Sequence, residues 1–335
     1  MLRIAITGSS GYYGRKLIEH VRRESPQTRI LGIDVVAPGG PAPDEFAHAD
    51  IRSADVRTAL TNFRPDTIVH LAFVVNPTHD NRLTHDINVG GTKNVFESVR
   101  TLRPSRFLMA SSATAYGAWP DNPVPISEDW PLKAREGFQY VTDKTTIEAE
   151  IQALADELPD VAVSWTRPTI IGGKGVNNYL SRFVLQIPMI VLPDGEDVPL
   201  QFVHEDDCVA ATWEILRQSA RGPFNIGPND WIPLTKLARL TNRWTIKVPF
   251  WMFKLVSWFW WHLRLPVLKY PPSLNEFIRY PWVIAPTRLE QELGFRFRYS
   301  AEETLLEMWG EHRRKQRARF PMRLFTRTEP ARRAA

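Results

Sequence analysis

The chain has 335 residues, of which 43% are hydrophobic, and this composition excludes a largely disordered protein. Its single cysteine, Cys208, excludes an intramolecular disulfide and indicates a reducing compartment. The net charge of +5 is unevenly spread: residues 311–335 hold nine Lys or Arg and two Glu, so this tail carries +7 and the remaining chain −2. The basic character thus belongs to a tail, and we expect no nucleic-acid partner for the body. Met1 leads directly into an apolar run without a secretory signal, so we expect a cytoplasmic protein.

The first predicted elements are a strand, a glycine turn and a helix. Residues 2–7 (LRIAIT) form a short apolar run, and residues 8–14 (GSSGYYG) place three glycines three apart before a helical pattern. Glycines let a backbone approach a pyrophosphate, and a helix N-terminus points free N–H groups and a positive dipole end at the same anion. The turn therefore predicts a bound dinucleotide, held by Gly8, Ser10, Gly11, Tyr12, Tyr13 and Gly14.

A carboxylate follows at the end of the second predicted strand. Residues 30–34 (ILGID) end in Asp34, 20 residues after Gly14. A carboxylate at this place accepts hydrogen bonds from an adenosine ribose and repels a 2′-phosphate, so NAD is favoured over NADP. The alternative interpretation of Asp34 is a simple turn residue at a strand end.

The same alternation continues along the chain. Further strands are predicted at residues 66–73, 106–112 and 161–167, and helices at 53–63, 80–102 and 140–158. This order predicts an α/β fold with a doubly wound parallel sheet, whose ligand site lies at the carboxyl ends of the strands, near Asp34, Ala72, Ser112 and Pro168. We expect a dinucleotide-binding domain over residues 1–167, a smaller substrate-binding region over 168–310 interleaved with it, and the basic tail at 311–335. Within the smaller region we expect a helix near 178–187 and short extended pieces near 189–192 and 201–204.

Residues 249–266 (PFWMFKLVSWFWWHLRLP) form an unusual aromatic stretch. On a helical wheel Lys254, Ser257 and Arg264 fall together with Trp261 between them, and apolar side chains occupy most of the remainder. The stretch falls short of the roughly 20 residues needed to span a bilayer. Three interpretations stay open: a lid over an apolar substrate, an interfacial anchor, or an oligomer contact such as a homodimer. The anchor and the basic tail together predict peripheral contact with an anionic membrane.

Tyr140 and Lys144 lie four residues apart in the predicted helix (YVTDK), so they share one face. An ammonium beside a phenol stabilises the phenolate and lowers its pKa towards the range of a general acid or base. Such pairs are also common on solvated helix faces. Ser112 ends the preceding strand on the ligand rim, 28 residues upstream of Tyr140, where a hydroxyl can orient a carbonyl or an alcohol. Together with a nicotinamide, these three side chains suffice for reversible hydride transfer.

These motifs resemble the extended short-chain dehydrogenases/reductases, the NAD-dependent epimerase/dehydratase group, from residue 2 to about residue 305. TGSSGYYG is similar to the family's TGxxGxxG, NVGGTKNV to its NVxGTxN helix, SSATAYG to its catalytic strand end, and YVTDK to YxxxK. RPTIIGG, QFVHEDD and EQELGF resemble later family segments. The resemblance implies a Rossmann fold and an NAD cofactor.

The resemblance also implies residue roles. Tyr140 would be the acid/base, Lys144 would hold the ribose and lower the Tyr140 pKa, and Ser112 would orient the substrate. Besides the glycine turn, Tyr140 and Lys144, the residues expected at the cofactor are Asp34, Asp50, Ile51, Leu71, Ala72, Phe73, Asn88 and Pro168. Asn88 has a structural alternative, since it can merely fix a bend or a backbone contact. We expect His70, His204 and Cys208 to be structural residues, and we expect no metal site.

Departures from the family pattern concern the substrate. Sugar-nucleotide members place an arginine before the VHxxD segment, where this chain has Leu200, although Asn177 and Asn178 resemble an asparagine pair of some sugar-nucleotide epimerases. The first hypothesis is therefore an NAD-dependent oxidoreductase that interconverts a secondary alcohol and a ketone on a largely apolar, lipid- or steroid-like substrate. The alternatives are a nucleotide-sugar epimerase or dehydratase and a non-catalytic NAD-binding scaffold.

Overall fold

The computed structural model describes residues 1–135, 137–176, 181, 184–185, 187–263 and 271–319. Its centre is a seven-stranded sheet in the order β11-β6-β5-β4-β1-β2-β3, in which every neighbouring pair is parallel. The strands are β1 (Arg3–Thr7), β2 (Arg29–Asp34), β3 (Glu45–His48), β4 (Thr67–His70), β5 (Arg106–Ala110), β6 (Ala162–Pro168) and β11 (Gly222–Ile226). The predicted doubly wound parallel sheet is confirmed. The order reverses between β1 and β4, which is where such sheets bind ligands.

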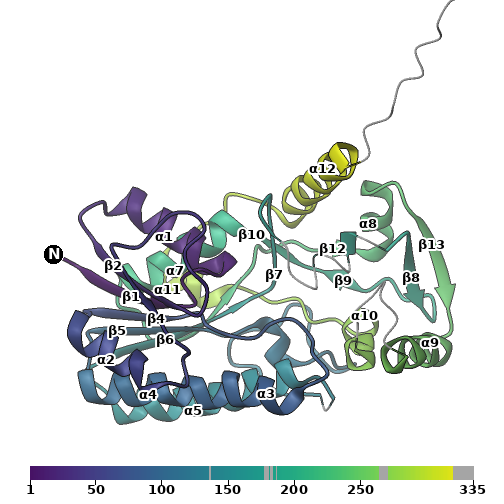
Figure 1. Ribbon diagram of the computed structural model, residues 1–335. Helices are drawn as coiled ribbons and strands as arrows, with labels where there is room; N and C mark the ends of the chain where they lie inside the picture. The colour runs from purple at the N-terminus through teal and green to yellow at the C-terminus, as the bar shows by residue number, and fades with distance from the viewer. Residues whose placement is uncertain (136, 177–180, 182–183, 186, 264–270, 320–335) are drawn as a thin grey trace, which may run out of the picture.

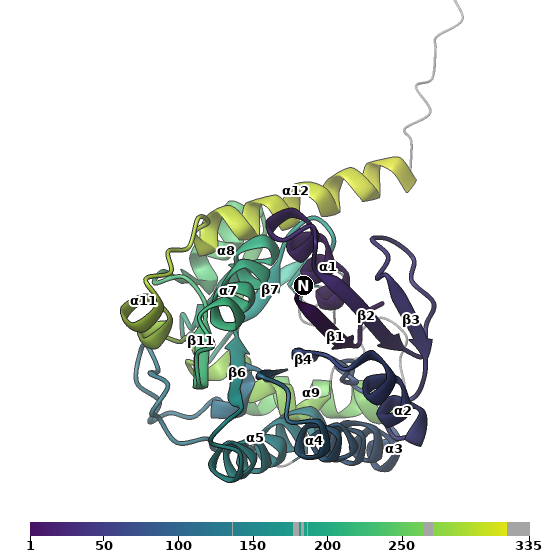
Figure 2. The ribbon, with the colours of Figure 1, turned by 90° about the vertical axis from the view of Figure 1, so that its left-hand side faces the viewer.

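Helices cover both faces of this sheet (Figure 2). One face packs against α1 (Tyr12–Glu24), α7 (Glu205–Arg217) and α11 (Thr287–Leu293), and the other against α2 (Ala54–Phe63), α4 (Gly91–Leu102) and α5 (Gln139–Glu157). The single helix expected at 80–102 is instead α3 (Asn81–His85), a π-helical turn (Asp86–Gly90) and α4. Gly91 permits this path, because a Cβ there would lie 2.5 Å from the Ile51 side chain.

The second region gathers at the end of the molecule remote from the N-terminus (Figure 1). It contains three two-stranded pairs: β7 (Ile170–Gly172) with β10 (Phe202–His204), β9 (Pro199–Leu200) with β12 (Ile232–Pro233), and β8 (Met189–Pro193) with β13 (Trp244–Val248). The helices are α8 (Leu234–Leu240), α9 (Phe250–His262) and α10 (Glu276–Arg279), with 3₁₀ turns at Ala113–Tyr116 and Pro272–Asn275. The predicted extended pieces correspond to β8 and β10, whereas most of the helix expected near 178–187 lies outside the described residues. The chain returns to the main sheet through β11, and a domain boundary at residue 167 stays a prediction.

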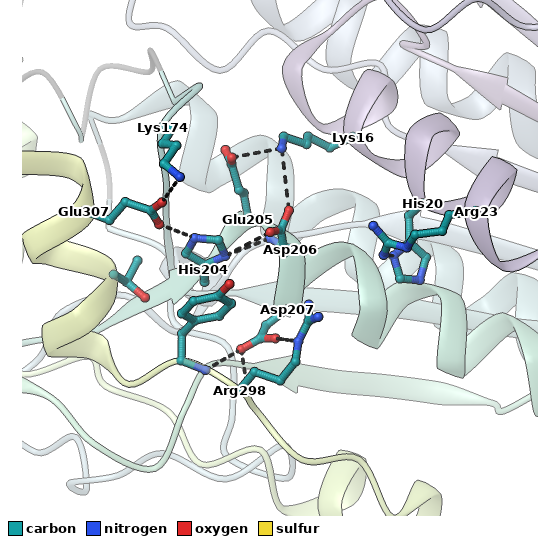
Figure 3. A network of polar contacts seen from close by, with 12 residues as sticks. Lys16, His20, Arg23, Lys174, His204, Glu205, Asp206, Asp207, Arg298 and Glu307 are labelled. Atoms are coloured by element: carbon teal, nitrogen blue, oxygen red, sulfur yellow. Dashed lines mark hydrogen bonds and ion pairs between the residues drawn. The ribbon is translucent and has the colours of Figure 1, made fainter. Parts of the chain in front are cut away.

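The last helix, α12 (Ala301–Arg319), crosses from the second region over the α1–α7 side of the sheet (Figure 2). The residues expected to begin the basic tail at 311 thus continue a helix, and residues 320–335 lie outside the described part. Figure 3 shows how polar contacts fix α12: His204 Nε2 lies 2.6 Å from Glu307 Oε2, and Lys174 Nζ lies 2.9 Å from Glu307 Oε1. Within the described chain, no helix is both long and apolar enough to cross a membrane.

Candidate functional site

The glycine turn between β1 and α1 is packed too tightly for any other residue type. Gly8 has φ +75°, and a Cβ on it would lie 2.6 Å from the backbone nitrogen of Ala72. A Cβ on Gly14 would lie 2.3 Å from the carbonyl oxygen of Gly8. In the described structure no side chain caps α1, and its first turn holds no acidic residue. The free N–H groups and positive end of α1 therefore fit the pyrophosphate of a dinucleotide.

The two tyrosines of the turn point to different places. The Tyr13 hydroxyl lies 2.6 Å from Thr212 Oγ1 and accepts a hydrogen bond from the Cys208 thiol, both on α7. Its side chain is therefore occupied by packing, and only its backbone N–H is left for the predicted role at the cofactor. The Tyr12 ring lies against Gly175, where a Cβ would come within 3.1 Å. Its hydroxyl is buried and has no hydrogen-bond partner among the described residues.

Asp34 is held at the end of β2 by its own loop. Its carboxylate accepts hydrogen bonds from the backbone N–H of Ser10 at 3.0 Å and of Val36 at 3.0 Å. The alternative interpretation, a turn residue, thus describes its contacts in this structure. These contacts also aim the carboxylate beside the glycine turn, so the contact with a ribose stays a prediction.

The residues expected at the adenine side are fixed by other side chains. Asp50 is paired with Arg52 at 2.6 Å, and Arg52 also reaches Asp86 at 2.7 Å. The Asn94 amide donates a 2.8 Å hydrogen bond to the carbonyl oxygen of Ile51. The Ile51 side chain is buried against α4. This loop is therefore rigidly placed, and Arg52 keeps the pKa of the Asp50 carboxyl low.

The loop after β4, residues 71–74, passes directly over Gly8 and is held by Asn88. The Asn88 side chain is fully buried: its oxygen accepts from Val74 N–H at 2.8 Å, and its amide donates to Asp143 Oδ2 at 3.0 Å. Asn88 was expected at the cofactor, but its amide is engaged in backbone and side-chain contacts here. In this structure the contacts of Asn88 agree with its structural interpretation, and they hold the loop of residues 71–74 in place.

Ser112 and Tyr140 meet at the carboxyl end of β5. Ser112 caps the 3₁₀ turn Ala113–Tyr116, its Oγ accepting from Thr114 Oγ1 at 2.9 Å, and its side chain hydrogen-bonds to the Tyr140 phenol. Burial raises the pKa of Tyr140 to about 12, and the hydrogen bond with Ser112 offsets only part of that rise. Lys144 is not among the groups that shift this pKa in the structure, so the expected lowering by Lys144 stays a prediction.

Lys144 is buried one turn along α5. Its Nζ donates a 2.6 Å hydrogen bond to the carbonyl oxygen of Ala110 and lies 3.4 Å from the centroid of the Phe73 ring. The Tyr140 ring centroid is farther from the same Nζ, at 5.8 Å. Burial lowers the pKa of Lys144 to about 7, against the opposing influence of Glu148 and Asp143. The ammonium is therefore easily deprotonated without a further partner, such as the predicted ribose.

A buried ion pair behind the site was not predicted from the sequence. Arg167 and Glu148 are both nearly inaccessible and lie 2.6 Å apart. Ser111 and Trp165 also donate hydrogen bonds to Glu148, which binds the end of β5 to β6. Glu148 lies four residues after Lys144, so the spacing of positions 140, 144 and 148 was the available signal.

A cavity of about 860 Å³ opens beside Tyr140. Aromatic and proline side chains form much of its wall, and α9 closes it with Trp258 and Trp261. Trp261 stacks on His79 with ring centroids 4.1 Å apart, which joins α9 to the loop after β4. The charged side chains that line the cavity are Arg135, Lys254 and Glu276. The Glu276 carboxylate lies 3.7 Å from the Arg135 guanidinium and 3.3 Å from the Lys254 ammonium, and the three side chains together carry a net charge of +1.

Three residues expected to be structural have structural contacts. His70 is fully buried between Thr7 at 2.7 Å and Thr92 at 2.9 Å, and burial lowers its pKa to about 3. His204 is buried and bonded to Glu307. Cys208 is buried, and burial raises the pKa of its thiol to about 12. None of these side chains lines the cavity beside Tyr140.

A parallel sheet with a glycine turn at its reversal point and a Ser–Tyr–Lys set at the neighbouring strand end defines a dinucleotide-dependent enzyme class. A model of the NAD dependent epimerase/dehydratase family matches residues 4–227, and the chain belongs to this family. Membership confirms the predicted family and NAD as the predicted cofactor. The residues assigned to NAD and to catalysis stay predictions.

Sequence relatives and solved structures match most of the chain. An uncharacterized protein of Mycobacterium tuberculosis is 27% identical over 316 residues, which cover 90% of this chain and 81% of that protein. UDP-glucose 4-epimerase of Thermotoga maritima, solved with UDP-glucose, superposes with a TM-score of 0.72 at 16% identity, covering 94% of this chain and 100% of that one. The dTDP-glucose 4,6-dehydratase of Bacillus anthracis, solved with NAD, gives 0.71 at 16% identity, covering 94% and 98%.

Proposed function

We propose that this protein is an NAD-dependent oxidoreductase that interconverts a secondary alcohol and a ketone on a substrate with a large apolar part. The observation that carries the proposal is the Tyr140 phenol, which is hydrogen-bonded to Ser112 and faces a tryptophan-walled cavity. NAD, when bound, supplies the oxidising or reducing equivalent. The glycine turn fits its pyrophosphate and Asp34 would hold its ribose, as described above.

The chain's own residues would handle the proton and the orientation of the substrate. Tyr140 would take the hydroxyl proton of an alcohol or return it to a ketone, and Ser112 would hold the same oxygen by a hydrogen bond. The high pKa of Tyr140 favours the protonated phenol, the state that donates to a ketone. A protonated Lys144, held by the ribose hydroxyls, would bring that pKa down for the reverse direction.

The chemistry of the cavity supports an apolar substrate. Trp119, Trp258 and Trp261 line it together with prolines, its charged side chains sum to only +1, and its other polar side chains are uncharged amides and hydroxyls and two histidines. At the position where sugar-nucleotide relatives place an arginine, Leu200 is buried in the hydrophobic core. The polar part of the substrate would thus be small and would lie at Ser112 and Tyr140.

The second candidate is a nucleotide-sugar epimerase or dehydratase. It is supported by the fold neighbours, whose names specify UDP-glucose 4-epimerase and dTDP-glucose 4,6-dehydratase. The Asn177–Asn178 pair that favours it lies outside the described residues. In such a reaction Tyr140 would serve the same proton step, but the cofactor would return to its starting state.

One assay separates the two candidates. The purified protein is mixed with NAD and a panel of apolar secondary alcohols, or with NADH and the matching ketones, and absorbance at the nicotinamide band is followed. An oxidoreductase changes the bulk cofactor with turnover, whereas a UDP- or dTDP-sugar converted without a change in absorbance would overturn the proposal in favour of the second candidate.

The role of Tyr140 is tested in parallel with Tyr140→Phe, which keeps the ring and removes the hydroxyl. We expect NAD binding to be retained and kcat to fall by about 10²- to 10⁴-fold, the usual contribution of a positioned acid or base. Equal turnover by variant and parent would remove Tyr140 from the mechanism. If both turnover and NAD binding are lost, the residue serves the cofactor and not the proton.

A further inference from the structure

Helix α9 is apolar on nearly all sides: Ser257 and the partly buried aromatic residues Phe250, Phe253, Trp260 and Trp261 face the protein, while other apolar residues are exposed. Ser257 is its one fully buried residue and accepts a 2.7 Å hydrogen bond from the Asn275 amide. Lys254 and Trp261 of the predicted polar stripe line the cavity. A surface helix of a globular protein normally has polar residues on the side away from the core, whereas α9 has exposed apolar residues there. The outward face of α9 therefore lacks a partner within the described chain.

That outward face is large and continuous with the neighbouring strand pair. Trp251 is 69% exposed, Leu255 48% and Phe259 49%, and these residues recur every four positions, so they lie on one side of α9. Trp244 of β13 is 81% exposed. More than half of the large exposed apolar residues belong to β8, β13, α9 and the position after it: Met189, Trp244, Ile246, Trp251, Met252, Leu255, Val256, Trp258, Phe259 and Leu263. Figure 1 places these elements together at one end of the molecule.

The segment that forms this face is rich in cations, and acidic groups of neighbouring segments pair with some of the cations around it: Glu276 with Lys254, and Asp194 and Glu196 with Arg279. From residue 231 to residue 275 the sequence contains no Asp or Glu, whereas it contains seven Lys or Arg. Lys247, on β13, is exposed. An apolar surface with tryptophans and an excess of cationic residues in the same segment complements the headgroup region of an anionic bilayer.

We propose that the outward face of α9, with β13, binds the surface of an anionic lipid bilayer. The 13-residue helix would lie in the plane of the headgroups, because at about 1.5 Å per residue it is too short to cross the hydrocarbon layer. Exposed tryptophans are suited to the headgroup level, and the lysine side chains can extend to lipid phosphates. A second copy of this chain would bring the same cation-rich segment against itself, which disfavours a symmetric contact.

This surface is distinct from the candidate active site. Leu255 and Phe259 do not line the cavity, whereas Trp258 and Trp261 do. Since a helix with its side chains is about 10 Å across, a bilayer on the outward face would lie that close to the cavity wall. The docking proposal does not depend on the proposed reaction, and it would hold for either candidate function.

The test is co-sedimentation of the full chain with vesicles of phosphatidylcholine alone or with about one quarter phosphatidylglycerol. We expect binding to the anionic vesicles, weaker binding to the neutral ones, and release by added salt. The Leu255→Glu/Phe259→Glu double variant is expected to lose binding about tenfold or more, because two charges are placed on the inserted face. Leu306→Glu is the matched control, since Leu306 is 41% exposed on α12 and lies outside the α9 face.

Three outcomes would overturn the proposal. The parent protein may not sediment with anionic vesicles at all; the double variant and the parent may bind equally; or Leu306→Glu may lose as much binding as the double variant. Light scattering without lipid provides a further check: a parent dimer that the double variant converts to a monomer would assign the face to a second copy. Circular dichroism of each variant establishes that it is folded.

Discussion

The glycine turn and the outward face of α9 differ in how much side-chain volume they tolerate. In the turn, a single added methyl group at Gly14 would lie 2.3 Å from a backbone oxygen, so no alternative residue fits. On α9, Trp251 is 69% exposed and its side chain has room for many replacements. The family model covers the turn and ends at residue 227, before α9. Motifs therefore identify the first region, whereas in the second the sequence identifies an aromatic stretch and the structure shows which of its residues are exposed.

The largest expected effect comes from a change in the turn itself. Gly14→Val is expected to abolish NAD binding, because the side chain would displace the Gly8 carbonyl and with it the N-terminus of α1. Gly39→Val is the matched control, since nothing lies within 4 Å of a Cβ at that glycine. NAD titration by calorimetry measures both. Retention of NAD affinity in the Gly14 variant would show that the turn can rearrange to accommodate a side chain. The turn and α9 would then no longer differ in their tolerance of added side chains.

The next largest effect is expected at the buried ion pair of Glu148 and Arg167 behind the site. Glu148→Gln is expected to lower the free energy of unfolding by about 3–5 kcal/mol, because Arg167 would be left buried without its charge partner. The groups bonded to Glu148 from Ser111, Trp165 and Arg167 are all donors, and the new amide nitrogen cannot accept from them. Urea unfolding is the measurement.

A surface pair provides the control for that experiment. Glu97→Gln breaks the contact with Arg100, in which both side chains are substantially exposed, and such pairs contribute at most about 1 kcal/mol. If the two variants lose the same stability, the pair of Glu148 and Arg167 is not the support that its burial indicates.

The sequence was sufficient for the cofactor side of the fold. The strands β1, β2, β5 and β6, the glycine turn and the positions of Ser112 and Tyr140 all follow from alternation and spacing. Two strands were missed. β3 is four residues long and half exposed, and β11 contains a glycine and a proline, so neither has a clear apolar pattern. The parallel pairing of β11 with β6 depends on tertiary contacts, which a local sequence pattern does not specify.

The sequence predicted which residues form the candidate site, but not their burial or their pKa shifts. Spacing placed Lys144 beside Tyr140 on one helix face, but it did not show that both groups are buried, and burial determines the direction of both pKa shifts. The pairing of Glu148 with Arg167 joins a helix to a strand 19 residues later. The wheel of 249–266 predicted a polar stripe, of which Ser257 is buried, Lys254 is exposed and Arg264 lies outside the described residues, and periodicity alone does not say which face of a helix points inward.

A third prediction uses the pKa of Lys144. Its pKa in the folded protein is about 7, below the ordinary 10.5, so between these values the unfolded chain binds a proton that the folded one does not. The stability of the parent should therefore rise with pH across that window, by up to about 1.4 kcal/mol per pH unit. Lys144→Met removes this group, so its stability advantage over the parent should shrink as the pH rises from 7 to 9.

Unfolding by urea at pH 7, 8 and 9 measures this slope without NAD. Lys93→Met serves as the control, because the Lys93 side chain is half exposed and its removal should leave the parent's slope unchanged. Parallel pH dependences of the parent and Lys144→Met would show that Lys144 keeps an ordinary pKa in the folded protein, and its burial would then have no electrostatic consequence.

The smallest expected effect is that of a substitution at Phe259. Comparing it with the same substitution at Phe253, on the same helix, tests the orientation of α9. Phe253 points inward, where it lines an apolar cavity of about 190 Å³ with Leu237 and Ile278, so Phe253→Ala should cost roughly 2–4 kcal/mol of unfolding free energy. Phe259 is 49% exposed, and Phe259→Ala should change that free energy by less than about 0.5 kcal/mol. Thermal and urea unfolding of the two variants measure the difference. A large loss at Phe259 would mean that this face is covered in solution without lipid, whereas a neutral result combined with weaker vesicle binding would show that its apolar character serves a partner and not the fold.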